Sequence, residues 1–322
     1  MKYIHSTNGR AVKLLGAIAA AGLASACLAT AAQAADTWST TIAKTAVPHA
    51  GCFHASYPST EWKQVACQPA PSILFLPSNG LGSQTVGNGH DYAIEVSGTL
   101  ISSALGSFPK VKVKTETGEG QANNYSLQLN SNFMSGSPAC DGASNPSNCL
   151  AWLQFIYSSG EHAVFMQYWL INYDATCPAG WNSDGGDCYK NSSAVAAPLQ
   201  VIKQLKYLSL SGTAVSGGLD TVVLTTKTDA YTTTGEDTVT YLSGYWTASE
   251  FNIVGDGGGS QAVFNAGTKI TDQIDVTDGL TTAPTCESNA GTTGETNNLN
   301  LGACTAAGGA TPSISFLESL AK

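Results

Sequence analysis

One glutamate in the C-terminal third of the chain stands among apolar and aromatic residues. It is Glu250, in the stretch SEFNIVGDGGGSQAVF at 249–264. A carboxyl group in such surroundings could act as a catalytic acid or base. The alternative is an exposed strand end before a turn formed by the glycines at 257–259. The two interpretations differ in whether the chain supplies a second polar group beside Glu250.

Two glutamines interrupt the apolar faces of predicted strands. In the stretch AVFMQYWLINY, Gln167 shares a face with Trp169, and Gln154 lies in the same way beside Trp152. A carboxylate can activate water while an amide side chain stabilises an oxyanion, so Glu250 and Gln167 form a candidate pair for peptide hydrolysis. The alternative is that both glutamines are buried with satisfied hydrogen bonds.

Other catalytic patterns are weakly represented. The sequence has no G-x-S-x-G or H-E-x-x-H motif, and four histidines follow position 35. The acidic loop at 182–188 could bind calcium through Asp184 and Asp187, although a solvated disulfide loop explains it more simply. We therefore predict no metal and no cofactor.

The charge balance disfavours nucleic acid as a partner. The chain has 322 residues, with 23 acidic and 14 basic side chains. Three of the basic ones, Lys2, Arg10 and Lys13, fall in the N-terminal segment, which leaves 14 − 3 = 11 lysines and no arginine beyond it. A negative chain without guanidinium groups is poorly suited to bind phosphates.

The N-terminus is typical of an export signal. Basic residues precede an apolar run at 14–31, and AQA at 32–34 offers a cleavage site. We predict a signal peptide at 1–34 and a secreted protein, with the periplasm as the alternative; Cys27 could instead be a lipoprotein cysteine. No later stretch is long and apolar enough to span a membrane, and we expect a monomer.

The eight cysteines after the signal fall into local pairs. The gaps within the pairs are 15, 9, 11 and 18 residues, and no C-x-x-C spacing suggests zinc. The simplest interpretation is four sequential disulfides in an oxidising compartment. They would join Cys52 to Cys67, Cys140 to Cys149, Cys177 to Cys188, and Cys286 to Cys304.

Short segments that alternate between apolar and polar residues predict an all-β fold. They occur from 91 to the C-terminus, separated by loops rich in Gly, Ser, Thr and Asn. We predict an antiparallel β-sandwich of the concanavalin A-like jelly-roll kind at 86–322, with one or two short helices, the first after Pro198. Residues 35–85 hold five of the 12 prolines and are predicted to form an N-terminal arm or propeptide.

The candidate residues also match known sequence patterns. ASEFNIVGDGGGSQAVF resembles the segment around the catalytic glutamate of the eqolisins, which are acid-acting glutamic peptidases. The spacings of 15 residues from Trp152 to Gln167 and 83 from Gln167 to Glu250 are similar to those of that family. FMQYWLINYDATCPAGW and YLSGYWTASEF resemble segments of the neprosins, secreted glutamic peptidases with an N-terminal pro-segment.

The resemblance implies a β-sandwich peptidase in which Glu250 and Gln167 are catalytic. Its neprosin part has a glutamate where this chain has CLAWLQF, so either Gln167 or Gln154 is the partner of Glu250, or the first catalytic residue is missing. Six residues are then expected to line the substrate cleft: Trp152, Gln154, Tyr168, Trp169, Tyr245 and Trp246.

The leading prediction is therefore a secreted peptidase that cleaves polypeptides at acidic pH. The alternative is a non-catalytic carbohydrate-binding sandwich, in which aromatic side chains among Asn, Asp and Gly loops stack on sugars. A glycosidase is a third possibility. It requires a second carboxylate near Glu250, for which Glu161 and Asp174 are the candidates.

Overall fold

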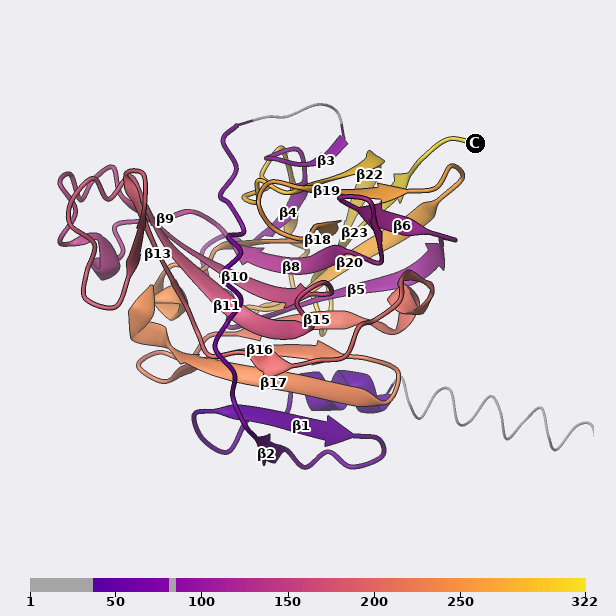
Figure 1. Ribbon diagram of the computed structural model, residues 1–322, viewed down its shortest axis with the longest axis horizontal. Coiled ribbons are helices and arrows are strands. Elements are labelled where there is room, and N and C mark those ends of the chain that lie inside the picture. The colour runs from indigo at the N-terminus through magenta and orange to yellow at the C-terminus, as the bar shows by residue number, and fades with distance from the viewer. Residues whose placement is uncertain (1–36, 81–84) are drawn as a thin grey trace, which may run out of the picture.

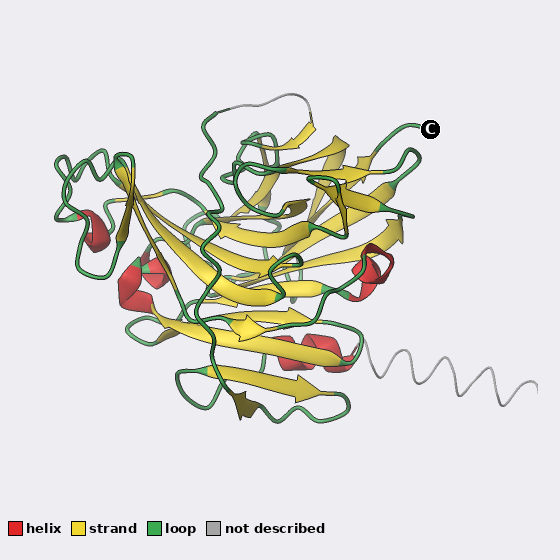
Figure 2. Ribbon diagram, viewed as in Figure 1, coloured by secondary structure: helices red, strands yellow, loops and turns green. Residues whose placement is uncertain are grey.

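Two large β-sheets make up most of the computed structural model, which describes residues 37–80 and 85–322 (Figures 1 and 2). All pairings are antiparallel except that of β19 with β22. The ten-stranded sheet has the order β12 (Asn182–Asp184), β13 (Asp187–Asn191), β11 (Ala163–Ile171), β10 (Leu150–Ser158), β8 (Tyr125–Ser131), β18 (Ala248–Gly255), β4 (Tyr92–Glu95) and β21 (Thr285–Ser288), with β14 (Val195–Ala196) beside β11 and β9 (Met134–Ser135) beside β10.

The thirteen-stranded sheet packs against it and confirms the predicted sandwich. Its order is β2 (Lys63–Val65), β1 (Cys52–Ser56), β17 (Asp229–Glu236), β16 (Leu219–Thr225), β15 (Ser209–Thr213), β5 (Ser103–Lys112), β20 (Lys269–Thr277), β23 (Ser313–Ser319), β22 (Thr296–Ala307), β19 (Gln261–Phe264), β6 (Glu116–Gly118) and β7 (Gln121–Ala122), with β3 (Thr85–Gly87) beside β22.

Helical structure is short, as predicted. The helix expected after Pro198 is a 3₁₀ helix, η2 (Ile202–Tyr207), and a second one, η4 (Leu242–Gly244), ends before Glu250, which lies in a strand. Two further 3₁₀ turns are η1 (Pro138–Cys140) and η3 (Asp237–Val239), and residues 37–43 form an α-helix.

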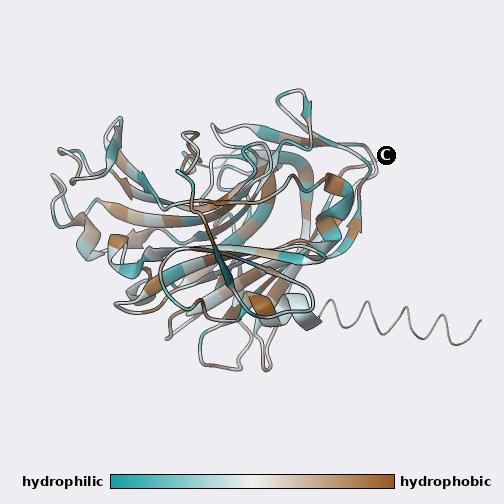
Figure 3. Ribbon diagram, turned by 60° about the horizontal axis from the view of Figure 1, so that its bottom comes forward, coloured by the Kyte–Doolittle hydropathy of each residue, from teal (hydrophilic) through white to brown (hydrophobic). Residues whose placement is uncertain are grey.

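The core lies between the two sheets and follows the alternation in the sequence, which is visible as alternating colours along the strands in Figure 3. Leu127 and Leu129 of β8 point into it. Gly106 of β5 allows a close approach, because a Cβ atom there would lie 2.1 Å from Cγ of Phe251. The large rings of one sheet therefore pack directly on the backbone of the other.

All four predicted disulfides are present: Cys52–Cys67, Cys140–Cys149, Cys177–Cys188 and Cys286–Cys304. Three of them close loops within one region of the chain. The fourth joins β21 of the ten-stranded sheet to β22 of the thirteen-stranded sheet. A crosslink of this kind typically contributes about 2–4 kcal/mol of stability.

The N-terminal region has two different parts. Residues 37–65 are part of the thirteen-stranded layer, since β1 and β2 are strands of that sheet and the helix at 37–43 packs Trp38 and Ile42 on Val223. Residues 71–78, which we call the arm, instead cross the ten-stranded sheet in front of β10 and β11 (Figure 1). The predicted signal peptide lies outside the described residues. Within 37–80 and 85–322, no helix is long and apolar enough to cross a membrane.

Candidate active site

A row of polar side chains crosses four strands of the ten-stranded sheet. Glu250 on β18 is opposite Asn130 on β8, Asn130 is opposite Gln154 on β10, and Gln154 is opposite Gln167 on β11. Residues opposite one another in an antiparallel pair project from the same face. We call this the outer face, because the intervening residues of these strands point into the inter-sheet core.

Glu250 has one heavily bonded and one unbonded carboxyl oxygen. Its Oε2 accepts hydrogen bonds from Asn130 Nδ2 at 3.2 Å, Thr292 N at 2.6 Å, Thr292 Oγ1 at 2.8 Å and Thr293 N at 3.3 Å. The side chain is 1% exposed, and Oε1 has no hydrogen-bond partner among the described residues. Four donors on one oxygen stabilise a negative charge on this group.

A second buried carboxyl group, Asp91, faces Glu250. Asp91 directly precedes β4, which pairs with β18 at Glu250, and its Oδ1 accepts a hydrogen bond from Asn252 Nδ2 at 2.9 Å. Its carboxyl group is within hydrogen-bonding reach of that of Glu250. Burial, reinforced by the nearby charge of Glu250, raises the pKa of Asp91 well above its ordinary value.

Sequence reasoning missed Asp91. The one available signal was an aspartate directly before the alternating segment that forms β4, and such a residue is usually a solvated strand end. Glu161 and Asp174, the carboxylates that were expected nearest to Glu250, are exposed at the two ends of β11. The group at hydrogen-bonding distance from Glu250 comes instead from a distant part of the chain.

The structure does not bring Gln167 and Glu250 together. Strands β10 and β8 lie between them, which at about 4.8 Å per strand puts the two backbones on the order of 14 Å apart. Gln167 Oε1 accepts hydrogen bonds from Phe75 N at 2.8 Å and Trp169 Nε1 at 3.2 Å. The amide that contacts Glu250 is that of Asn130, so the expected Glu250–Gln167 contact is corrected.

Gln154 stands between these two positions. Its Nε2 donates to Gln128 Oε1 at 3.1 Å, and Asn130 Nδ2 approaches the same Gln128 oxygen at 3.4 Å. Gln128 Nε2 in turn donates to Glu295 Oε2 at 3.1 Å. The amides on the outer face therefore form a connected network that begins at Glu250.

The aromatic residues predicted to line a cleft divide between the two faces of the sheet. Trp152 and Trp169 are directly opposite each other on the outer face and are fully buried. Tyr168 and Trp246 lie in the inter-sheet core, because Tyr168 neighbours Gln167 in an extended strand and must point the other way. Tyr245 is half-buried against the core. These residues form no exposed platform for sugar stacking.

The arm occupies the outer face as an extended peptide. Gln167 bonds it twice, accepting from Phe75 N and donating from Nε2 to Ile73 O at 3.4 Å. Asn191 Nδ2 donates to Pro71 O at 3.2 Å. The Phe75 side chain is fully buried against Phe165, with ring centroids 5.8 Å apart.

Beyond Phe75 the arm bonds the loop that holds Glu250. Gly294 N donates to Leu76 O at 2.7 Å, and Ser78 N donates to Thr292 O at 2.7 Å. Thr292 is also a donor to Glu250 Oε2. The loop at 291–294 thus lies between the arm and the carboxyl group of Glu250.

Glu295 ties the arm to the glycine-rich loop. Its Oε1 accepts from Leu76 N at 3.1 Å and Gly259 N at 3.0 Å, while Oε2 accepts from Thr293 Oγ1 at 2.6 Å in addition to Gln128. Burial raises the pKa of Glu295, although these donors partly offset the effect. The glycines after Glu250 therefore help to hold the arm.

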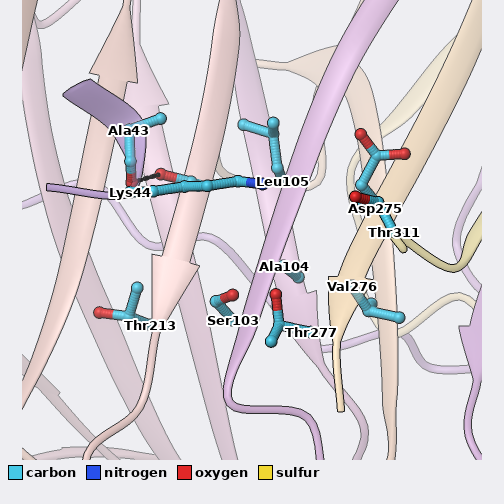
Figure 4. A pocket seen from close by; sticks show the side chains of 11 residues that line it. Ala43, Lys44, Ser103, Ala104, Leu105, Thr213, Asp275, Val276, Thr277 and Thr311 are labelled. Carbon is cyan, nitrogen blue, oxygen red and sulfur yellow. Dashed lines mark hydrogen bonds between the residues drawn. The ribbon is translucent and has the colours of Figure 1, made fainter. Parts of the chain in front are cut away.

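Other features of the described residues lie apart from this site. No group of three or more His, Cys, Asp and Glu side chains within 37–80 and 85–322 is placed to hold a metal ion, and Asp184 pairs with Asp187 in an exposed hairpin. A pocket of about 190 Å³ lies on the thirteen-stranded sheet, where Lys44 extends past Leu105 near Asp275 (Figure 4). It contains none of the predicted site residues.

Comparison with known proteins places the chain in no established family. No family model matches the sequence, and no curated protein matches it. Among solved structures, a similar chain is that of Scytalido-glutamic peptidase with a peptide based transition state analog. The identity is 13%, the TM-score is 0.31, and the match covers 70% of this chain and 97% of that chain. Similarity at this distance does not define the activity of the present chain.

Proposed function

We propose that this chain is a peptidase that hydrolyses polypeptides at acidic pH with Glu250 as its general base and acid. One observation carries the proposal: the outer face binds an extended peptide, the arm, and leads it to the loop that holds the Glu250 carboxyl group. A surface that bonds the backbone carbonyls and amides of one peptide suits a polypeptide substrate. The sequence resemblance to glutamic peptidases gives independent support.

The chemistry follows from a carboxylate beside water and a peptide bond. Glu250 would remove a proton from water while the water oxygen attacks the carbonyl carbon, giving a tetrahedral intermediate. The C–N bond then breaks as the Glu250 carboxyl returns that proton to the leaving nitrogen. Asn130 would orient Glu250 through its 3.2 Å hydrogen bond, and Gln167 would hold the substrate backbone rather than the oxyanion.

Buried acids support work at acidic pH. Burial raises the pKa of Asp220 to about 8 and those of Asp256 and Glu318 to about 7. These groups are uncharged in acid, where their burial costs least. The four disulfides fit an oxidising compartment, so we further propose that the protein is exported.

The described structure is a closed state of this proposed enzyme. Glu250 is 1% exposed beneath the loop at 291–293, and the arm bonds that loop from the other side. A substrate would need the arm to leave the outer face. Residues 52–65 could stay in place, because they are strands of the thirteen-stranded sheet.

The test is digestion of a denatured protein substrate from about pH 2 to 7 after incubation in acid to loosen the arm. The wild-type chain is compared with Glu250→Gln, and with Glu116→Gln as a control for loss of another buried glutamate. We expect activity at low pH in the wild type and the control, and none in Glu250→Gln. A folded wild type without activity over the whole range would reject the proposal.

A further inference from the structure

We propose that Asp91 is the partner acid of Glu250, and that the two carboxyl groups share one proton as a pair. The inference deepens the proposed function and rests on it only for its consequence in catalysis. It replaces Gln167 as the second member of the site. Gln167 and Glu250 share no hydrogen-bond partner among the described residues, whereas Asp91 and Glu250 are in direct reach of each other.

Gly291 shows how tightly the two acids are held. A Cβ atom at this position would lie 3.0 Å from Asp91 Oδ2 and 3.1 Å from Glu250 Oε1. Both oxygens therefore converge on the same point of the loop at 291–294. Because a side chain at 291 would press on both oxygens, the absence of a Cβ atom lets the loop close over the pair.

The remaining hydrogen bonds show which oxygens must share the proton. Asp91 Oδ1 is bonded by Asn252, and Glu250 Oε2 is bonded by Asn130, Thr292 and Thr293. The other two oxygens, Asp91 Oδ2 and Glu250 Oε1, are buried and have no further partner among the described residues. Two buried carboxylates in contact cannot both be ionised, and one proton between them removes the repulsion.

The donors also decide which acid holds the charge. Glu250 receives four hydrogen bonds on one oxygen, whereas Asp91 receives one from Asn252 and one from the backbone of Gly87. The pair is therefore best written as Glu250 carboxylate and Asp91 carboxylic acid, with Asp91 donating to Oε1. In the proposed reaction, the proton on Asp91 would keep the pair singly charged, with Glu250 as the carboxylate that acts as base. Asp91 would also fix the orientation of Glu250, which makes Asp91 a positioning residue.

Other acids contribute to the field at Asp91. The charge of Glu318 on β23 also raises the pKa of Asp91, and Asn252 donates a hydrogen bond to each of these two side chains. Asp272 on β20 faces Glu318 in turn. The test must therefore separate the effect of Glu250 from that of this second pair.

The pair can be tested without measuring activity. The full chain is labelled with ¹³C at Asp and Glu carboxyl carbons, and its resonances are followed by NMR over pH. Asp91→Asn assigns the Asp91 signal, and Glu250→Gln removes the partner charge at nearly constant shape. We expect Asp91 to titrate late in the wild type and distinctly earlier in Glu250→Gln. An unchanged Asp91 midpoint in Glu250→Gln would overturn the pair.

Two further variants guard against misfolding and indirect effects. Asp272→Asn changes a buried acid that does not face Glu250, so it should leave the Glu250 effect on Asp91 intact. Gly291→Ala keeps both acids but pushes on their shared position, so it should shift the Asp91 midpoint. A Gly291→Ala protein that is folded and shows the wild-type Asp91 midpoint would also count against the pair.

The consequence for catalysis is read from the pH–rate profile. In the wild type, raising the pH should remove the shared proton, and activity should fall as it leaves. Asp91→Asn should extend activity to higher pH while lowering kcat. Asp272→Asn should leave the high-pH limb of the pH–rate profile, where activity falls, at its wild-type position. If no variant has peptidase activity but the NMR shift is present, the proposed function fails and the pair stands; activity with an unmoved limb in Asp91→Asn would contradict the pair's role.

Discussion

Two pairs of buried acids lie side by side in this protein, and they differ in how their charge is supported. Asn252 joins them, since its Nδ2 donates to Asp91 Oδ1 at 2.9 Å and to Glu318 Oε1 at 2.8 Å. In the first pair, four hydrogen bonds converge on one oxygen of Glu250. In the second pair, Glu318 accepts one amide hydrogen bond on each oxygen, from Asn252 and Asn297, and neither oxygen of Asp272 has a hydrogen-bond partner among the described residues.

The first pair is prepared for charge on one oxygen of Glu250, which has four donors, whereas the second pair offers Glu318 one amide donor on each oxygen and Asp272 none. Burial raises the pKa of Asp272 well above its ordinary value and that of Glu318 to about 7. Burial is therefore the main cause of the raised pKa values in both pairs, at Asp91 in the first and at Asp272 and Glu318 in the second, and a neighbouring acid adds to it at Asp91 and Asp272. Glu250 and Glu295 both combine burial with main-chain donors from loops that also contact the arm, but Glu295 spreads its four donors over two oxygens, whereas Glu250 receives all four on Oε2. Donors aimed at one oxygen are thus the better indicator of function in this fold.

The largest expected effect is the loss of activity when the prepared charge is removed. Glu250→Gln should lower kcat by at least about 100-fold, since that is the usual contribution of a general acid or base. Asp272→Asn removes an acid from the second pair and should keep kcat within about threefold of wild type, because Asp272 contacts no group of the site. Steady-state kinetics at acidic pH measures both. Equal losses in the two variants would erase the distinction between the pairs.

The second prediction concerns stability against pH. A carboxyl group with a higher pKa in the folded chain contributes its stability below the unfolded pKa and loses it as the pH rises through the folded pKa. Asp220, Asp256 and Glu318, with pKa values raised to about 8, 7 and 7, should therefore destabilise the fold as pH increases. Between its unfolded and its folded pKa, each of these groups lowers the free energy of unfolding by up to about 1.4 kcal/mol per pH unit.

Denaturant unfolding at about pH 4, 6 and 8 tests this slope. The protein should be most stable at about pH 4, which lies near the unfolded pKa values of these groups. Glu318→Gln should flatten the curve, because an amide stays neutral at every pH. Stability that rises with pH instead would mean that these carboxyl groups are ionised and well supported in the folded chain.

The third prediction concerns the arm. Phe75→Ala removes a fully buried ring from the outer face and should weaken docking of the arm by about 3–5 kcal/mol. Hydrogen exchange at 71–78 should then rise, and activity should appear with a shorter incubation in acid. Phe53→Ala, which removes an equally buried ring from β1, serves as the control. Faster exchange at the arm in the control alone would disprove the docking role of Phe75.

The smallest effect is expected at Gln167. Gln167→Ala deletes the hydrogen bonds to Ile73 and Phe75, which should cost about 1–3 kcal/mol of peptide binding. We therefore expect a higher KM with kcat nearly unchanged. A fall in kcat at constant KM would show instead that Gln167 acts on the transition state, as the spacing in the sequence first suggested.

Local properties of the chain were readable from the sequence alone. The alternation in NYSLQLN predicted that Leu127 and Leu129 face the core, and they do. The four disulfides were predictable because each cysteine lies within 18 residues of its partner, where chain connectivity favours pairing. Glu250 could be singled out because its apolar and aromatic neighbours are adjacent in sequence.

Strand order was decided only by the tertiary structure. The sheet places β10 and β8 between Gln167 and Glu250, whereas sequence spacing carries no information on which strands are neighbours. Asp91 reaches the site because β4 pairs with β18, and its partner Asn252 is 161 positions away in the chain. The position of the arm on the outer face likewise depends on long-range contacts, since Phe75 and Ile73 bond Gln167 more than 90 positions away. Long-range pairing depends on the sum of many weak contacts, so no short segment contains it.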